Sequence, residues 1–221
     1  MTLLPFVAAT LGATALWLGW QTLQAARSRS AARAGYFDAV TPLFDRVRTR
    51  IEPTGLPRIA ADLGEDSFDL QAIPDSLTFR KLPALWVMVT LTAPTPVKAT
   101  LDIMARPTGN EPFSHFSRLP QSLACPPELP EGSGIRSDNA AALPPLDLIA
   151  PHLAIFSDPK VKELVISPKG LRLVILADEA ERGRYLIFRD AETGRTPLSI
   201  DRLLPLLDAL RALRQTLTEA R

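Results

Sequence analysis

The chain opens with a long apolar stretch that shows no alternation of hydrophobic and polar positions. From Leu3 to Leu23 it reads LLPFVAATLGATALWLGWQTL and carries no charged side chain. A helix of this length, at ~1.5 Å per residue, spans about 30 Å, the thickness of the hydrocarbon core of a bilayer. The stretch therefore predicts one transmembrane helix, and the lipid bilayer is an expected partner, bound through Leu3 to Leu23.

The flanks of this stretch favour a retained anchor over a cleaved signal peptide. No Lys or Arg precedes the apolar run, and Leu23 spoils a small-x-small cleavage site ending at Ala25. Trp17 and Trp20 lie near its end, where interfacial aromatic residues are found. The basic residues that follow it are Arg27, Arg29 and Arg33. The positive-inside rule then predicts a single-pass inner- or plasma-membrane protein with a cytoplasmic C-terminal domain.

After a basic linker at residues 27–35, the apolar spacing predicts a helix. Apolar residues recur every three or four positions from Tyr36 to Ile51, the period of an amphipathic helix, with an interruption at Pro42. After this segment the apolar residues recur every two positions, the period of a strand.

Two strands are predicted between residues 84 and 106. Residues 84–93 (ALWVMVTLTA) are apolar on both faces, and residues 97–106 alternate between apolar and polar. The intervening Pro94-Thr95-Pro96 predicts an antiparallel hairpin. Shorter strands are predicted at residues 59–63, 68–72 and 77–80.

A Pro-rich loop is predicted over residues 107–139, which contain PPELPEGSG. Phe113 and Phe116, three residues apart, predict one short helical turn within it.

Regular periodicity returns in the last third of the chain. The pattern predicts a helix over 140–156, a hairpin of strands 161–167 and 171–177, a strand over 184–189, and a helix that Ser199 caps. Antiparallel hairpins with segregated helices define an α+β fold, here behind one transmembrane helix. The predicted units are a transmembrane anchor (1–26), the linker (27–35), a helix with antiparallel strands (36–106), the Pro-rich loop (107–139) and a helix, three strands and a helix (140–221).

Charge and cysteine content narrow the function classes. Lys and Arg number 25 and Asp and Glu 24, so the near-zero net charge gives no reason to expect a nucleic-acid partner. Cys125 is the single cysteine, so no intrachain disulfide can form, which fits a reducing compartment.

Two short motifs resemble those of penicillin-recognising serine enzymes. Ser137-Asp138-Asn139 matches S-D-N, and Ser157 to Lys160 matches S-x-x-K. The order of the two motifs is reversed, no K-T-G follows, and Pro159 disrupts the helix that S-x-x-K requires. A helix N-cap and a turn explain these residues better.

Metal and cofactor motifs give no candidate either. His115 and His152 have no His or Cys partner at metal-ligand spacing. The acidic group lacks the spacing of a calcium loop; it consists of Asp62, Glu65, Asp66 and Asp69. We therefore predict no catalytic, cofactor-binding or metal residue, and no cofactor.

The second half of the chain resembles one group of proteins in its topology. LPEGSGIRSDNAAALPPL followed by KELVISPKGLRLVIL is similar to segments of uncharacterised single-pass bacterial membrane proteins, in a domain of unknown function. The resemblance implies an anchored domain and carries no activity or functional residue.

These patterns favour a non-enzymatic interaction or accessory domain that binds another protein at the cytoplasmic face of the membrane. A membrane-tethered hydrolase is one alternative, in which Ser137 and Asp138 would meet His115 or His152 in a cleft formed by residues 107–139 and 179–183. A periplasmic domain behind a signal-anchor is the other.

Overall fold

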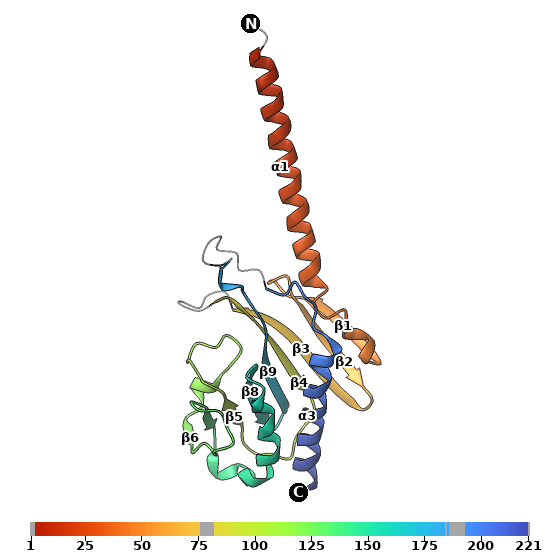
Figure 1. The fold of residues 1–221 in the computed structure, drawn as a ribbon. Helices are drawn as coiled ribbons and strands as arrows, with labels where there is room; N and C mark the ends of the chain where they lie inside the picture. The colour runs from red at the N-terminus through yellow and green to blue at the C-terminus, as the bar shows by residue number, and fades with distance from the viewer. Residues whose placement is uncertain (1–2, 76–81, 184, 186–192, 221) are drawn as a thin grey trace.

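A computed structural model of the chain describes residues 3–75, 82–183, 185 and 193–220. Its described strands form one antiparallel sheet in the order β1-β2-β3-β4-β9-β8-β5-β7-β6 (Figure 1). The nine strands are β1 (Arg46–Ile51), β2 (Pro57–Leu63), β3 (Asp66–Asp75), β4 (Ala84–Leu91), β5 (Leu101–Met104), β6 (Gln121–Leu123), β7 (Gly134–Ser137), β8 (Val161–Ser167) and β9 (Gly170–Glu179).

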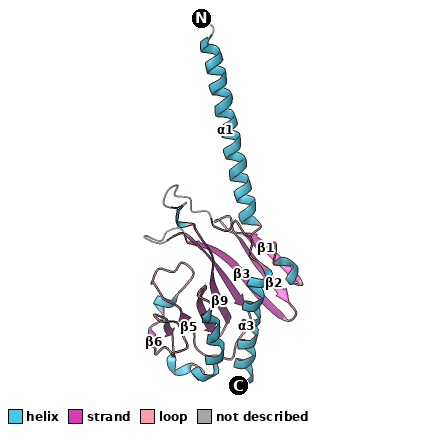
Figure 2. Cartoon of the chain, in the orientation of Figure 1, coloured by secondary structure: helices cyan, strands magenta, loops and turns pink. Residues whose placement is uncertain are grey.

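The first face of the sheet carries the main hydrophobic core. Successive side chains of a strand point to opposite faces, so Leu85, Val87 and Val89 of β4 share this face and are fully buried. The helix α3 (Ile200–Glu219) and the 3-10 helix η5 (Ala150–Ser157) pack against this side (Figure 2). The leucines that α3 buries are Leu203, Leu206, Leu207, Leu210, Leu213 and Leu217.

The second face is apolar only in part, and a loop covers it there. Residues 107–119, which we call the cover segment, include the 3-10 helix η2 (Phe116–Arg118). Phe113 and Phe116 of the cover segment form a small apolar cluster with Met104 of β5 and Val174 of β9. This smaller cluster is the counterpart of the main core across the sheet.

The helix α1 (Leu3–Ala34) projects away from the sheet, with the N-terminus at its far end (Figure 1). The predicted transmembrane anchor is wrong: within the described residues, no helix combines the length and apolarity needed to cross a membrane. Over residues 11–25, leucines and tryptophans alternate with glycine, threonine and glutamine, which dilute the apolar character that the uncharged run suggested. This finding also contradicts the single-pass, membrane-localised protein that followed from the anchor.

The predicted helix from Tyr36 to Ile51 is also wrong. It is replaced by a turn, the 3-10 helix η1 (Thr41–Leu43) and strand β1. Pro42 stands at the start of η1, and beyond it arginines alternate with Val47 and Thr49 in the two-residue period of a strand. These residues form a strand, not a helix, because β1 pairs with β2.

The predicted hairpin between residues 84–93 and 97–106 does not form. β4 lies between β3 and β9, whereas β5 lies between β7 and β8. The strand predicted over 97–106 is shortened to β5, all four residues of which are buried. β4 and β5 therefore pair with other strands and not with each other across the Pro94-Thr95-Pro96 turn.

The remaining elements give a mixed outcome. The predicted strands 59–63, 68–72, 161–167 and 171–177 are confirmed as β2, β3, β8 and β9, and the predicted C-terminal helix is confirmed as α3. The helix expected over 140–156 is instead three 3-10 helices, η3 (Ala140–Ala142), η4 (Leu146–Leu148) and η5. The Pro-rich loop contributes β6, β7 and η2. The predicted strands 77–80 and 184–189 lie outside the described residues.

The turn between β8 and β9 shows why glycine is required there. Gly170 adopts a φ of +149°, and a Cβ at this position would collide with the carbonyl oxygen of Leu91. The close approach sets β9 directly against the end of β4, with Leu91 paired to Leu171.

Candidate functional site

Two acidic side chains lie on the second face of the sheet, at the edge of its apolar cluster. Asp102 of β5 is paired with Val165 of β8, and Glu163 of β8 is paired with Met104 of β5. The two acids are thus diagonal neighbours on adjacent strands, a relation that places Cα atoms about 7–8 Å apart and long side chains within reach of each other. Sheet register, not sequence proximity, brings them together.

Both carboxyl groups are buried. Asp102 is 3% exposed and Glu163 is 0% exposed. Among the described residues, one oxygen of Asp102 and both oxygens of Glu163 accept no hydrogen bond. Buried carboxylates are rare unless they are paired, and an unpaired polar group in a protein interior is costly.

Burial and mutual repulsion shift the titration of this pair. Burial, followed by the charge of Glu163, raises the pKa of Asp102 to about 8. Burial likewise raises the pKa of Glu163 to about 7, although the nearby Ser114 hydroxyl and Arg172 oppose the rise. Near neutral pH the pair therefore retains at least part of one proton.

The nearby arginines offset the charge of the pair only in part. Arg172 of β9 lowers the pKa of both acids, yet its Nε atom is buried and has no hydrogen-bond partner among the residues that the structure describes. Arg136 of β7 is paired with Asp102 in the sheet, but its guanidinium donates to the carbonyl oxygen of Leu119 at 2.9 Å. Its Cζ atom also lies 5.6 Å from the ring centroid of Phe116. Arg136 is thus directed toward the cover segment and its flank.

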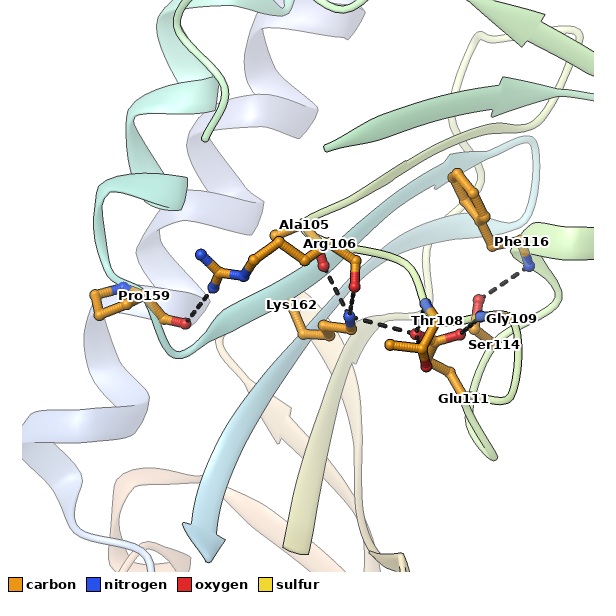
Figure 3. Close-up of polar contacts among 9 residues, drawn as sticks. All are labelled: Ala105, Arg106, Thr108, Gly109, Glu111, Ser114, Phe116, Pro159 and Lys162. Atoms are coloured by element: carbon orange, nitrogen blue, oxygen red, sulfur yellow. Dashed lines mark hydrogen bonds and ion pairs between the residues drawn. The ribbon is translucent and has the colours of Figure 1, made fainter. Parts of the chain in front are cut away.

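A polar clamp fastens the start of the cover segment (Figure 3). The Glu111 carboxylate accepts hydrogen bonds from the backbone N–H of Thr108 at 2.6 Å and of Gly109 at 3.0 Å. Burial would raise the pKa of Glu111, but the hydrogen bonds from Thr108 and the charge of Lys162 outweigh it and lower that pKa. Glu111 is therefore held as an anion above the sheet.

Lys162 of β8 completes this clamp. Its Nζ atom lies 3.3 Å from Glu111 and donates to the carbonyl oxygens of Ala105 at 2.7 Å and Arg106 at 2.6 Å (Figure 3). Arg106 has a φ of 46°, the left-handed region that favours glycine, at the point where the chain leaves β5 for the cover segment. Lys162 stabilises this turn by binding the carbonyl on either side of it.

A pocket of about 310 Å³ lies beside the clamp, between the cover segment and the sheet. Glu111 and Lys162 line it together with Trp86, whose ring packs 5.0 Å from that of Phe113. The indole Nε1 of Trp86 is buried and has no hydrogen-bond partner in the described structure. Trp86 therefore contacts both the pocket and the cover segment.

The candidate catalytic residues of the hydrolase alternative lie in separate contacts. The Ser137 hydroxyl accepts a hydrogen bond from the backbone N–H of Asn139 at 3.0 Å. The Asp138 carboxylate accepts one from the backbone N–H of Thr100 at 2.8 Å. His152 meets the Thr216 hydroxyl of α3 at 2.9 Å, and burial lowers its pKa. His115 is exposed in the cover segment. Within the described residues, no hydrogen bond joins Ser137 or Asp138 to His115 or His152.

The other residues weighed in the sequence have structural contacts. Ser157 and Lys160 flank a turn, in which Asp158 accepts the backbone N–H of Lys160. Cys125 is exposed, with its sulfur 3.2 Å from the carbonyl oxygen of Ser133.

Asp62, Asp66 and Asp69, three of the acidic residues between positions 62 and 69, also serve as local partners. Asp62 accepts a hydrogen bond from the Ser67 hydroxyl, and Asp69 forms an ion pair with Arg58. Asp66 binds the guanidinium groups of Arg211 and Arg214 on α3 at 2.8 and 2.6 Å. Among the described residues, no group of three or more His, Cys, Asp or Glu is arranged to hold a metal ion.

A second candidate is the surface of α1. Large apolar side chains on this helix are 49% to 78% exposed; they are Leu11, Leu16, Trp17, Leu18, Trp20 and Leu23. At the foot of the helix, Arg29, Arg33 and Arg195 line a pocket of about 220 Å³, which we call the basic notch.

Sequence reasoning missed Asp102 and Glu163. The only sequence signal is a charged residue within an apolar strand, in LDIM and in VKELVIS. Such residues usually face solvent on a half-exposed strand, whereas these two are buried on the face of the sheet that carries the cover segment.

Comparison with protein-family models, with curated proteins and with solved structures gave no match to this chain.

Proposed function

We propose that the chain is a non-enzymatic protein-binding domain and that α1 docks onto another protein. The observation that carries this proposal is the set of exposed apolar side chains around α1, which projects from the sheet (Figure 1). Exposed apolar surface of this kind marks interaction sites in folded proteins. Trp17 and Trp20 are the residue type that most often anchors such contacts.

The charges on α1 select the class of partner. The helix carries Arg27, Arg29 and Arg33 near its C-terminal end and no acidic residue along its length. Parallel association of two copies would align these like charges, whereas acidic residues on a partner would complement them. We therefore expect an apolar helix of another protein, followed by acidic residues that lie near Arg27 and Arg33.

A photo-crosslinking residue in place of Leu16, in cells that produce the full chain, tests this directly. Leu16 is 78% exposed, so the probe reaches a partner without disturbing the sheet. The expected adduct is a peptide of another protein with apolar residues every three or four positions and acidic residues at one end. Adducts only to a second copy of this chain, only to lipid, or to nothing would overturn the proposal.

Affinity for the partner so identified is then measured with purified proteins. Combining Leu16→Glu with Leu23→Glu places two charges in the proposed contact, and we expect binding to weaken by about 100-fold or more. Leu204→Glu is the matched control, because Leu204 is a 39% exposed leucine on α3. Equal losses for the control and the α1 variant would contradict docking through α1.

A further inference from the structure

We propose that Asp102 and Glu163 form a proton-binding site that keeps the cover segment closed, and that loss of its proton opens this segment. The inference is independent of docking through α1. The two carboxyl groups lie on adjacent strands beneath one loop and are 3% and 0% exposed. Such a pair is tolerated when a proton removes one of the two charges.

The surrounding groups leave the pair short of positive charge. The side chains that face it are Arg172 from β9, Lys162 from β8, Arg136 from β7, and Glu111 and Ser114 from the cover segment. Lys162 and Arg136 donate to backbone carbonyls at the two ends of the cover segment. Glu111 is an anion and adds repulsion to both acids. Arg172 lowers the pKa of both acids and Lys162 lowers that of Glu163, yet the pKa of each acid stays raised, so these charges balance the two buried carboxylates only in part.

The cover segment is the part of the protein that moves away from the sheet when both acids ionise. β5 and β8 are each held by ladder hydrogen bonds to strands on both sides. The cover segment instead rests on the Glu111 clamp, two phenylalanine rings and contacts with Arg136. Lifting it admits water to both carboxylates and leaves the sheet intact, so it is the least costly response.

The direction of the pH effect follows from the raised pKa values. Asp102 and Glu163 take up protons in the closed state with pKa values of about 8 and about 7, well above those of hydrated carboxyl groups. The closed state therefore binds more protons than the open state, and rising pH favours opening. The closed state therefore begins to lose stability near pH 4, where hydrated carboxyl groups ionise, and the loss levels off above the two raised values.

Trp86 reports the opening because it packs against Phe113 of the cover segment. The chain has three tryptophans, and Trp17→Phe with Trp20→Phe leaves Trp86 as the single reporter in the full chain. Between about pH 5 and about pH 9.5 we expect its emission to shift to longer wavelength and its quenching by acrylamide to rise at least twofold. The far-ultraviolet circular dichroism should not change, since the sheet persists.

Two variants test whether the acid pair is the cause. Glu163→Gln and Asp102→Asn, each in the single-tryptophan background, keep the shape of the side chain and remove its charge. Each should abolish the transition or shrink it at least threefold and leave Trp86 protected at high pH. His115→Gln is the control, because His115 is an exposed ionisable residue of the cover segment that lies outside the acid pair. This variant should keep the transition.

Three results would overturn the proposal. They are a Trp86 signal that does not change across the pH range, a transition that survives in both acid variants, and a transition that His115→Gln removes. If one acid variant does not fold, hydrogen exchange of the cover-segment amides in the other, corrected for intrinsic pH dependence, provides the same comparison.

Discussion

The two faces of the sheet are built by the same strands but are covered in different ways. On the first face, α3 contributes six buried leucines and closes a continuous apolar core. On the second face, the cover segment contributes two phenylalanines and spans two buried acids. Burial alone therefore does not define a core: the first face is stabilised by apolar contact, and the second depends on a protonation state.

The largest expected effect comes from the first face. Leu207 of α3 is 0% exposed, and Leu207→Ala leaves a cavity in the main core. We expect the free energy of unfolding to fall by about 2–5 kcal/mol, at every pH. Chemical denaturation followed by circular dichroism measures it, and a loss under about 1 kcal/mol would show that α3 is not a central part of the core.

A smaller effect is expected from the equivalent change on the second face. Phe116→Ala removes a ring that is 8% exposed from the cover segment. Because this segment can open without unfolding the sheet, we expect a loss of about 1–3 kcal/mol and faster hydrogen exchange confined to its amides. Exchange that also accelerates in α3 would contradict separate covering of the two faces.

The acid pair itself should show an effect that depends on pH. The pKa of Asp102 is raised in the folded protein, so the unfolded chain gives up this proton at lower pH than the folded protein does. The free energy of unfolding therefore falls as the pH rises from near 4 to about 8. Asp102→Asn should therefore stabilise the protein by about 1–2 kcal/mol at high pH and have little effect at low pH. Denaturation at the two pH values measures the difference, and destabilisation at high pH would reverse the argument.

The smallest effect concerns the ion pairs that fasten α3. Asp66 binds Arg211 and Arg214, which are 34% and 37% exposed at their side chains. Solvent screens such pairs, so Asp66→Asn should cost about 0.5–1 kcal/mol, and less in high salt. A cost equal to that of Leu207→Ala would mean that charge, and not apolar contact, holds the first face.

The sequence predicts those elements whose pattern is local and complete. β8 and β9 are two apolar runs around a glycine turn, and α3 carries leucines at helical spacing behind Ser199. The failures come where long-range pairing decides. The residues of β1 fit a helical period, yet they pair with β2, and β4 pairs with β9, about 90 residues later in the sequence.

The acid pair could not be predicted for the same reason. Asp102 and Glu163 are separated by about 60 residues and meet only through the register of β5 with β8. The apolar run before Leu23 misled in another way, because absence of charge does not ensure sufficient apolarity once glycine, threonine and glutamine are counted. Local patterns thus indicate elements but not their neighbours.

The arginines of β1 have a consequence for how the chain behaves at high concentration. β1 is an edge strand, and its exposed Arg46, Arg48 and Arg50 alternate along it. An open edge invites strands of other molecules to add to it, which begins aggregation, and a row of like charges repels a second copy. The opposite edge, β6, is only three residues long. The sheet is thereby protected from stacking edge to edge into fibres.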